Sequence, residues 1–125
     1  MPAKSGKTSY LRGRWAEQTA LEYLQTKNIK LLEKNFRSTF GEIDLIMQDK
    51  NIILFIEVRY RSNNYFHTAL ESINRQKCER IIITSNHYLS QNRNASQMDC
   101  RFDVVTLTGD QESPTIEWIK NAFQA

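Results

Sequence analysis

Three carboxylates interrupt the two apolar segments of the stretch GEIDLIMQDKNIILFIEVRYR, which begins at residue 41. Glu42 and Asp44 fall in the first segment, and Glu57 falls in the second, followed two positions later by Arg59. Carboxylates are uncommon in strands and costly to bury without a partner. Carboxylate oxygens are also the ligands that Mg²⁺ and Mn²⁺ prefer. These residues therefore predict either a divalent metal site or a set of structural ion pairs.

The two segments are predicted to form an antiparallel hairpin with a two-residue turn at positions 50–51. This register places Asp44 opposite Glu57 and Glu42 opposite Arg59. Side chains that face each other across two strands lie about 4.5 to 5.5 Å apart at Cβ. Two carboxylates at that distance repel unless a proton or a cation lies between them.

A predicted amphipathic helix carries a further acid, Glu17, on its apolar face. At 100° per residue, the apolar or small residues within about 60° of Glu17 are Tyr10, Gly13, Ala20, Leu21 and Leu24. The helix must pack on the sheet through this face, so Glu17 is a third candidate metal ligand beside Asp44 and Glu57.

Each acid also has a structural interpretation. Glu42 and Arg59 would form a cross-strand ion pair, and Asp44 would accept hydrogen bonds from the next loop. The acid on the helix would pair with Arg37 or Arg61. Spacing alone leaves the structural and the metal-binding interpretations open.

The pattern of the whole chain predicts one α/β domain built on a mixed sheet, at residues 10–125, after a basic flexible tail at residues 1–9. The predicted elements are a helix at 10–27, strands at 29–38, 41–48 and 52–61, a helix at 71–89, a strand at 100–107 and a strand or helical turn at 115–124, with loops at 61–69 and 90–99.

Composition sets wide limits on function. The chain has 125 residues, a net charge of +3 and a pI near 8.9, which permits a polyanionic partner without requiring one. No signal peptide and no membrane span are expected, because no long apolar run is present. Cys78 and Cys100 have neither zinc nor disulfide spacing, so we expect two reduced cysteines in a cytoplasmic protein.

Several motifs in order resemble the PD-(D/E)XK nuclease superfamily and, more closely, the bacterial YraN family of uncharacterised proteins, which is similar to archaeal Holliday junction resolvases. The motifs are GRWAEQTALEYL, NFRSTFGEIDLIMQD, LFIEVRYR, Lys77 with ERIIITSNHYL, RFDVV and WIKNAF, and the match spans residues 13–123. The resemblance implies a restriction-endonuclease-like fold with a mixed central sheet flanked by helices and an α-β-β-β-α-β core.

The resemblance also implies a role for each acid. Asp44 corresponds to the first metal-binding acid and Glu57 to the acid of Glu-x-Lys, with Val58 offering its backbone carbonyl. Glu17 matches a helix glutamate that resolvase-like members place near the metal. The implied cofactor is Mg²⁺ or Mn²⁺, which would activate a water and stabilise charge on the scissile phosphate.

The sequence departs from the family pattern at Arg59, where lysine is usual. Arginine cannot act as a general base, although its forked donors can clamp a phosphate oxygen. Three readings remain open: Arg59 supports catalysis as a clamp, the site is catalytically silent, or Lys77 supplies the amine.

These residues lead to a first hypothesis, a metal-dependent endonuclease that hydrolyses DNA phosphodiester bonds. By resemblance it would select branched or single-stranded DNA in recombination or repair and act as a homodimer. Arg14, Arg37 and Arg61 are expected to contact phosphate. A silent DNA-binding protein with a nuclease fold is the alternative, and a protein-interaction domain is a third reading.

Overall fold

The computed structural model describes residues 2–63 and 65–125 of the chain. Its elements in chain order are α1 (Pro2–Gln25), β1 (Lys30–Ser38), β2 (Gly41–Asp49), β3 (Ile52–Arg61), α2 (Phe66–Glu71), α3 (Arg75–Gln91), α4 (Arg93–Ser96), β4 (Asp99–Thr108) and β5 (Thr115–Phe123).

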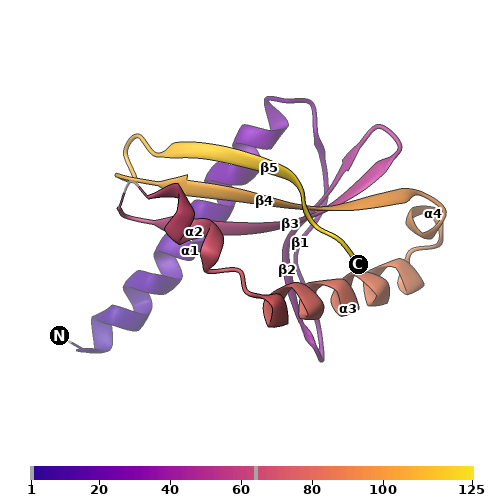
Figure 1. The fold of residues 1–125 in the computed structure, drawn as a ribbon, viewed down its shortest axis with the longest axis horizontal. Helices are drawn as coiled ribbons and strands as arrows, with labels where there is room; N and C mark the ends of the chain where they lie inside the picture. The colour runs from indigo at the N-terminus through magenta and orange to yellow at the C-terminus, as the bar shows by residue number, and fades with distance from the viewer. Residues whose placement is uncertain (1, 64) are drawn as a thin grey trace.

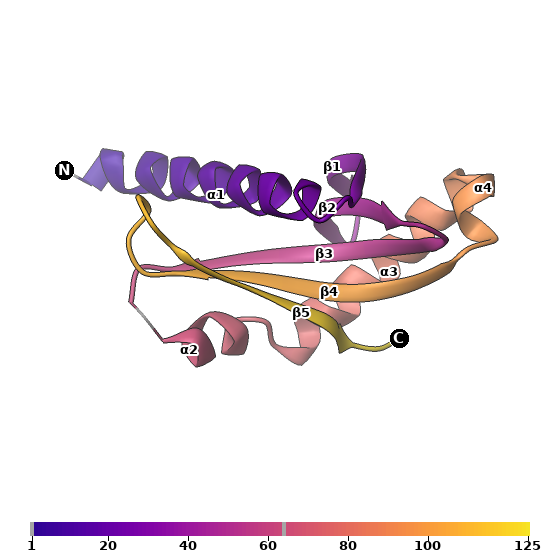
Figure 2. The ribbon, with the colours of Figure 1, turned by 90° about the horizontal axis from the view of Figure 1, so that it is seen from above.

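The strands form one mixed sheet in the order β1-β2-β3-β4-β5. Only β3 and β4 run parallel among the described pairs, and the chain between them crosses over through α2, α3 and α4 (Figure 1). Figure 2 shows α1 on one face of the sheet and α2 and α3 on the other. The predicted mixed α/β class is therefore confirmed, and the arrangement is consistent with a restriction-endonuclease-like fold.

Both faces of the sheet are buried, which explains why β3 reads as a nearly continuous apolar run. Leu54 and Ile56 point into the core beneath α1, whereas Ile53 and Phe55 point into the core beneath α3. The α1 residues in the first core are Ala16, Ala20, Leu21 and Leu24. This two-sided packing fixes the position of each side chain along β3, including the acid that follows Ile56.

The predicted register of the hairpin is confirmed. The Cα pairs of β2 and β3 run from Asp49–Ile52 to Leu45–Ile56, around a turn in which Lys50 has a φ of 55°. The described ladder ends at Leu45–Ile56, and before it residues 41–43 of β2 pair with β1. The two strands separate at the point where the acids lie.

The helix boundaries correct three predictions. α1 begins at Pro2 rather than near residue 10, and proline suits a first helical turn because its missing N–H has no partner to lose there. α3 begins at Arg75 rather than at residue 71, because the Asn74 side chain caps it by accepting a hydrogen bond from the Lys77 N–H at 2.9 Å. The preceding segment, predicted as a loop, contains α2.

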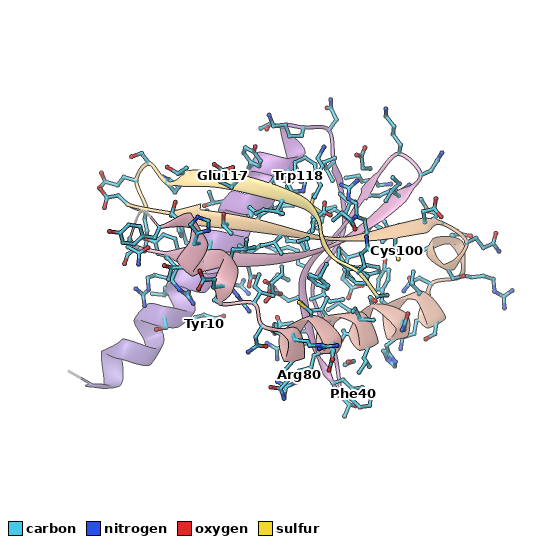
Figure 3. The ribbon with its side chains drawn as sticks, viewed as in Figure 1. Tyr10, Phe40, Arg80, Cys100, Glu117 and Trp118 are labelled. Atoms are coloured by element: carbon cyan, nitrogen blue, oxygen red, sulfur yellow. The ribbon has the colours of Figure 1, made fainter. Side chains whose placement is uncertain are left out.

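The first turns of α1 extend past the sheet (Figures 1 and 2), so the predicted apolar face is only partly buried. Tyr10 is 63% exposed (Figure 3) and Gly13 is exposed too. At the other end of the chain, where a strand or a helical turn was expected, Thr115–Phe123 form the edge strand β5. Residues 93–96, in a predicted loop, form α4. None of the described helices is long and apolar enough to cross a membrane.

Candidate active site

Asp44 lies where β2 and β3 separate. Its Oδ2 accepts a hydrogen bond from the backbone N–H of Val58 at 2.9 Å. If the β2–β3 ladder continued, a main-chain carbonyl of β2 would accept from this N–H; the Asp44 carboxylate accepts from it instead. Asp44 is therefore held by a strand rather than by a loop, contrary to the structural interpretation of the sequence.

Glu57 is 2% exposed, and its two oxygens have different surroundings. Oε2 lies 2.8 Å from Nη2 of Arg59 and 3.6 Å from Nζ of Lys77 on α3. Oε1 is buried and has no hydrogen-bond partner. Buried carboxylate oxygens are rarely left unpaired, so Oε1 marks a place where a proton or a cation is needed.

The two carboxyl groups interact directly. Burial, and then the neighbouring Glu57, raise the pKa of Asp44 from its ordinary 3.8 to about 8, although the Val58 N–H opposes this. Burial also raises the pKa of Glu57, while the charges of Arg59 and Lys77 oppose the increase. The repelling acid pair that the register predicted is therefore present.

Asp103 is a buried acid of the same sheet, and both of its carboxylate oxygens have hydrogen-bond donors. It is fully buried, and its oxygens accept hydrogen bonds from Nε and Nη2 of Arg101, from Nε1 of Trp118 and from the backbone N–H of Asn121, at 2.8 to 2.9 Å. Trp118 belongs to β5 (Figure 3). Asp103 joins β4 to β5, which is a structural role, whereas Glu57 lacks such a set of donors.

A cleft of about 420 Å³ opens onto Asp44. α1 contributes Arg12, Gly13 and Glu17 to its lining, and β3 contributes Arg59 and Arg61. Arg61 also donates from Nη1 to the Tyr60 carbonyl at 2.8 Å. The structure thus brings Glu17, Asp44 and Arg61 to one cleft. Arg14 and Arg37 line a neighbouring hollow of about 410 Å³ with Glu42.

Glu17 reaches this region from the helix as predicted, but its partner was not predicted. Its Oε1 accepts a hydrogen bond from Nδ2 of Asn35 at 2.9 Å, so neither Arg37 nor Arg61 is the partner. Burial raises the pKa of Glu17, and Asn35 opposes this. Asn35 is the residue that sequence reasoning missed. An asparagine in the middle of a predicted strand was the available signal.

Glu42 and Arg59 do not form the expected cross-strand pair. Oε2 of Glu42 lies 3.5 Å from Nε of Arg37, its Cα partner on β1, and Arg59 binds Glu57 instead. The reason is that the β2–β3 ladder ends before Glu42. Arg37 remains largely exposed, so this pair contributes little to stability.

The fit of a metal can be judged from these donors. Within the described parts of the chain, no group of three or more acidic, histidine or cysteine side chains is close enough to hold a metal ion. The three predicted acids therefore do not form one cluster. Of the three, Asp44 and Glu57 are adjacent, and Glu57 has an unpaired buried oxygen, so these two hard donors fit a divalent cation. The role of the Val58 carbonyl stays a prediction.

Comparison with known proteins identifies relatives of the chain. The sequence model of a family described as "Uncharacterised protein family UPF0102" matches residues 16–107. A UPF0102 protein of Nitrosomonas europaea is 46% identical over 90% of this chain and 92% of its own length. Similar proteins of Nitrosococcus oceani and Methylococcus capsulatus are 42% and 40% identical, over 90% and 98% of this chain and 91% and 98% of their own lengths.

Proposed function

The chain belongs to the uncharacterised protein family UPF0102, and from the acids at and beside its cleft we propose that it is a metal-dependent nuclease that hydrolyses DNA phosphodiester bonds. The observation that carries the proposal is the half-buried Asp44 against the buried Glu57, a pair that needs a cation or a proton. Two basic side chains lie on one oxygen of Glu57. The resemblance of the motifs to the PD-(D/E)XK superfamily supports the same reading.

Asp44 and Glu57 would hold Mg²⁺ or Mn²⁺, with Glu17 at the edge of the cleft as a further acid. When bound, the cation would polarise a water and neutralise charge on the scissile phosphate. Glu57 can take part through Oε1, because only Oε2 is occupied by Arg59 and Lys77.

Lys77 is the better candidate for proton transfer. Arginine stays protonated, so Arg59 can fix Glu57 and clamp a phosphate oxygen but cannot accept a proton. Lys77 projects from α3 toward the same carboxylate, with Nζ 3.6 Å from Oε2. An amine from a helix would therefore replace the lysine that the family pattern expects on the strand.

The shape of the cleft favours an unpaired strand as substrate. Asp44 lines a cleft of about 420 Å³ and Glu57 is almost fully buried beside it, so a scissile phosphate must enter the cleft to approach them. A single strand can do so more easily than the backbone of an intact duplex. The resemblance to archaeal resolvases favours branched DNA and a homodimer.

One observation favours a second candidate, a silent DNA-binding protein with a nuclease fold. Arg59 binds Glu57 at 2.8 Å and already neutralises the carboxylate that a metal would use. In that case the guanidinium is a permanent substitute for the cation. The protein would bind DNA without cutting it.

The first test is Mn²⁺ binding by calorimetry, followed by cleavage of single-stranded, branched and duplex DNA. Binding should be lost when Asp44→Ala and Glu57→Ala are combined, and kept in Asp49→Asn, which removes one charge from the far end of the same strand. Circular dichroism checks that each variant is folded. If the parent bound DNA but neither bound Mn²⁺ nor cut DNA, the silent alternative would hold. If the acids were dispensable for Mn²⁺ binding, the proposed site would be wrong.

A further inference from the structure

Asn35 has an unusual backbone conformation inside β1. Its φ is 52°, in the left-handed region that side chains disfavour, although asparagine tolerates it better than most residues. It lies between the Cα pairs Lys34–Leu45 and Phe36–Ile43, so it is opposite Asp44. A left-handed residue in the interior of a strand persists only when its surroundings fix it, and such outliers gather at functional sites.

The amide of Asn35 joins two acids from different elements. Its Nδ2 donates to Oε1 of Glu17 on α1 at 2.9 Å and to Oε1 of Glu42 on β2 at 3.1 Å. An amide nitrogen has two hydrogens, so each carboxylate receives one of them. The two acids would otherwise repel each other. Asn35 therefore fixes where the Glu17 carboxylate lies.

The position of that carboxylate matters because Glu17 lines the cleft that opens onto Asp44. The same side chain also lines the neighbouring hollow that contains Glu42 and Asn35. The Glu17 carboxylate therefore lies between the Asn35 amide, which binds it, and the cleft that contains Asp44.

We propose that Asn35 is a positioning residue, whose left-handed backbone aims its amide so that the Glu17 carboxylate stays at the lining of the cleft, near the divalent cation that Asp44 and Glu57 would hold. This inference rests on the proposed function, because it assumes that the cleft binds a metal. Residues that orient ligands through a hydrogen bond typically change metal affinity 10- to 100-fold when they are removed. A residue that only connected α1 to the sheet would change stability and leave metal affinity as it is.

Asn35→Gly separates the two roles, because glycine adopts the left-handed backbone readily but has no amide. We expect its Mn²⁺ dissociation constant to rise about 10-fold, the lower end of the range for such residues. The matched control is Asn121→Gly. Asn121 also has a positive φ, 55°, inside a strand, and its contact with Asp103 is through the backbone N–H, which glycine keeps. The control should bind Mn²⁺ like the parent.

A second variant tests whether Asn35 acts through Glu17. In a Glu17→Gln background, Asn35→Gly should weaken Mn²⁺ binding by less than twofold more, because the group it positions is already lost. All affinities are measured by calorimetry well below the melting temperature of each variant, so a less stable variant still reports on binding.

The outcomes distinguish this inference from the proposed function. If the parent binds Mn²⁺ and Asn35→Gly binds it equally well, the positioning role is wrong and the nuclease proposal stands. The same conclusion follows if the effects of the Asn35 and Glu17 substitutions multiply independently. If the parent binds no Mn²⁺, both the metal-dependent function and the positioning role are overturned.

Discussion

Neutralising Asp44 should make the metal-free protein more stable. In the folded state Asp44 is half-buried beside Glu57, and its partial removal from water together with the neighbouring charge raises its pKa from an ordinary 3.8 to about 8. At neutral pH the folded chain therefore keeps a proton on this carboxyl group, whereas the unfolded chain releases it. Asp44→Asn removes this penalty, and the introduced amide can still donate a hydrogen bond toward Glu57.

The magnitude follows from the two pKa values. Each pH unit above the unfolded pKa costs the folded state about 1.4 kcal/mol until its own pKa is reached. The penalty is absent below pH 3.8, grows as the pH rises and levels off above about 8. At pH 7 it amounts to about 4 kcal/mol. This is an upper bound on the gain in stability. The Val58 N–H now donates to the Asp44 carboxylate, and that hydrogen bond is lost wherever the introduced amide turns its nitrogen toward Val58.

The assay is urea unfolding of metal-free parent and Asp44→Asn at several pH values between 4 and 8. The two should have equal stability near pH 4, and the variant should be more stable by at least about 1 kcal/mol at pH 7. Asp49→Asn serves as the control and should show no growing difference. Saturating Mn²⁺ should stabilise the parent and reverse the order. A variant that is less stable than the parent at pH 7 without metal would show that the ionised carboxylate is structural.

Four further predictions concern the basic side chains and the glycines. Lys77→Met should reduce DNA cleavage about 100-fold or more while leaving Mn²⁺ binding in place, measured by single-turnover kinetics and calorimetry. Arg59→Lys should raise cleavage if the silent alternative holds, because lysine at this position can lose its proton; unchanged activity would assign proton transfer elsewhere. Gly13→Ala should stabilise the protein by about 0.5 to 1 kcal/mol in urea unfolding, because its Cβ would meet open space. Gly41→Ala should instead destabilise it by about 1 to 3 kcal/mol, because its Cβ would lie 3.3 Å from α3 atoms.

The hairpin shows what the sequence can predict. A two-residue turn and two apolar segments suffice to set the register of β2 on β3, and the like-charged neighbours Asp44 and Glu57 follow from it. The class of the fold follows from the order of elements in the same way. These features depend on patterns that extend over many residues, so one irregular position does not disturb them.

The partners of the acids could not be predicted in this way. The left-handed conformation of Asn35 is a property of a single residue, so no periodicity of the sequence reports it. The separation of β2 from β3 likewise has no sequence signal, yet it decides that Glu42 contacts Arg37 rather than Arg59. The short helix α2 was missed because six residues are too few for a helical period.

The two buried acids of the sheet show why the cleft is the part of the molecule to test. Asp103 and Glu57 lie on adjacent parallel strands, and both are almost fully buried. The fold supplies Asp103 with a full set of donors, so the same sheet is able to satisfy a carboxylate when only stability is required. The fold leaves Oε1 of Glu57 without a hydrogen-bond partner and places the Asp44 side chain beside Glu57. Natural proteins keep such unfavourable groupings chiefly where they serve binding or catalysis, and a divalent cation between the two carboxylates would remove the unfavourable interaction.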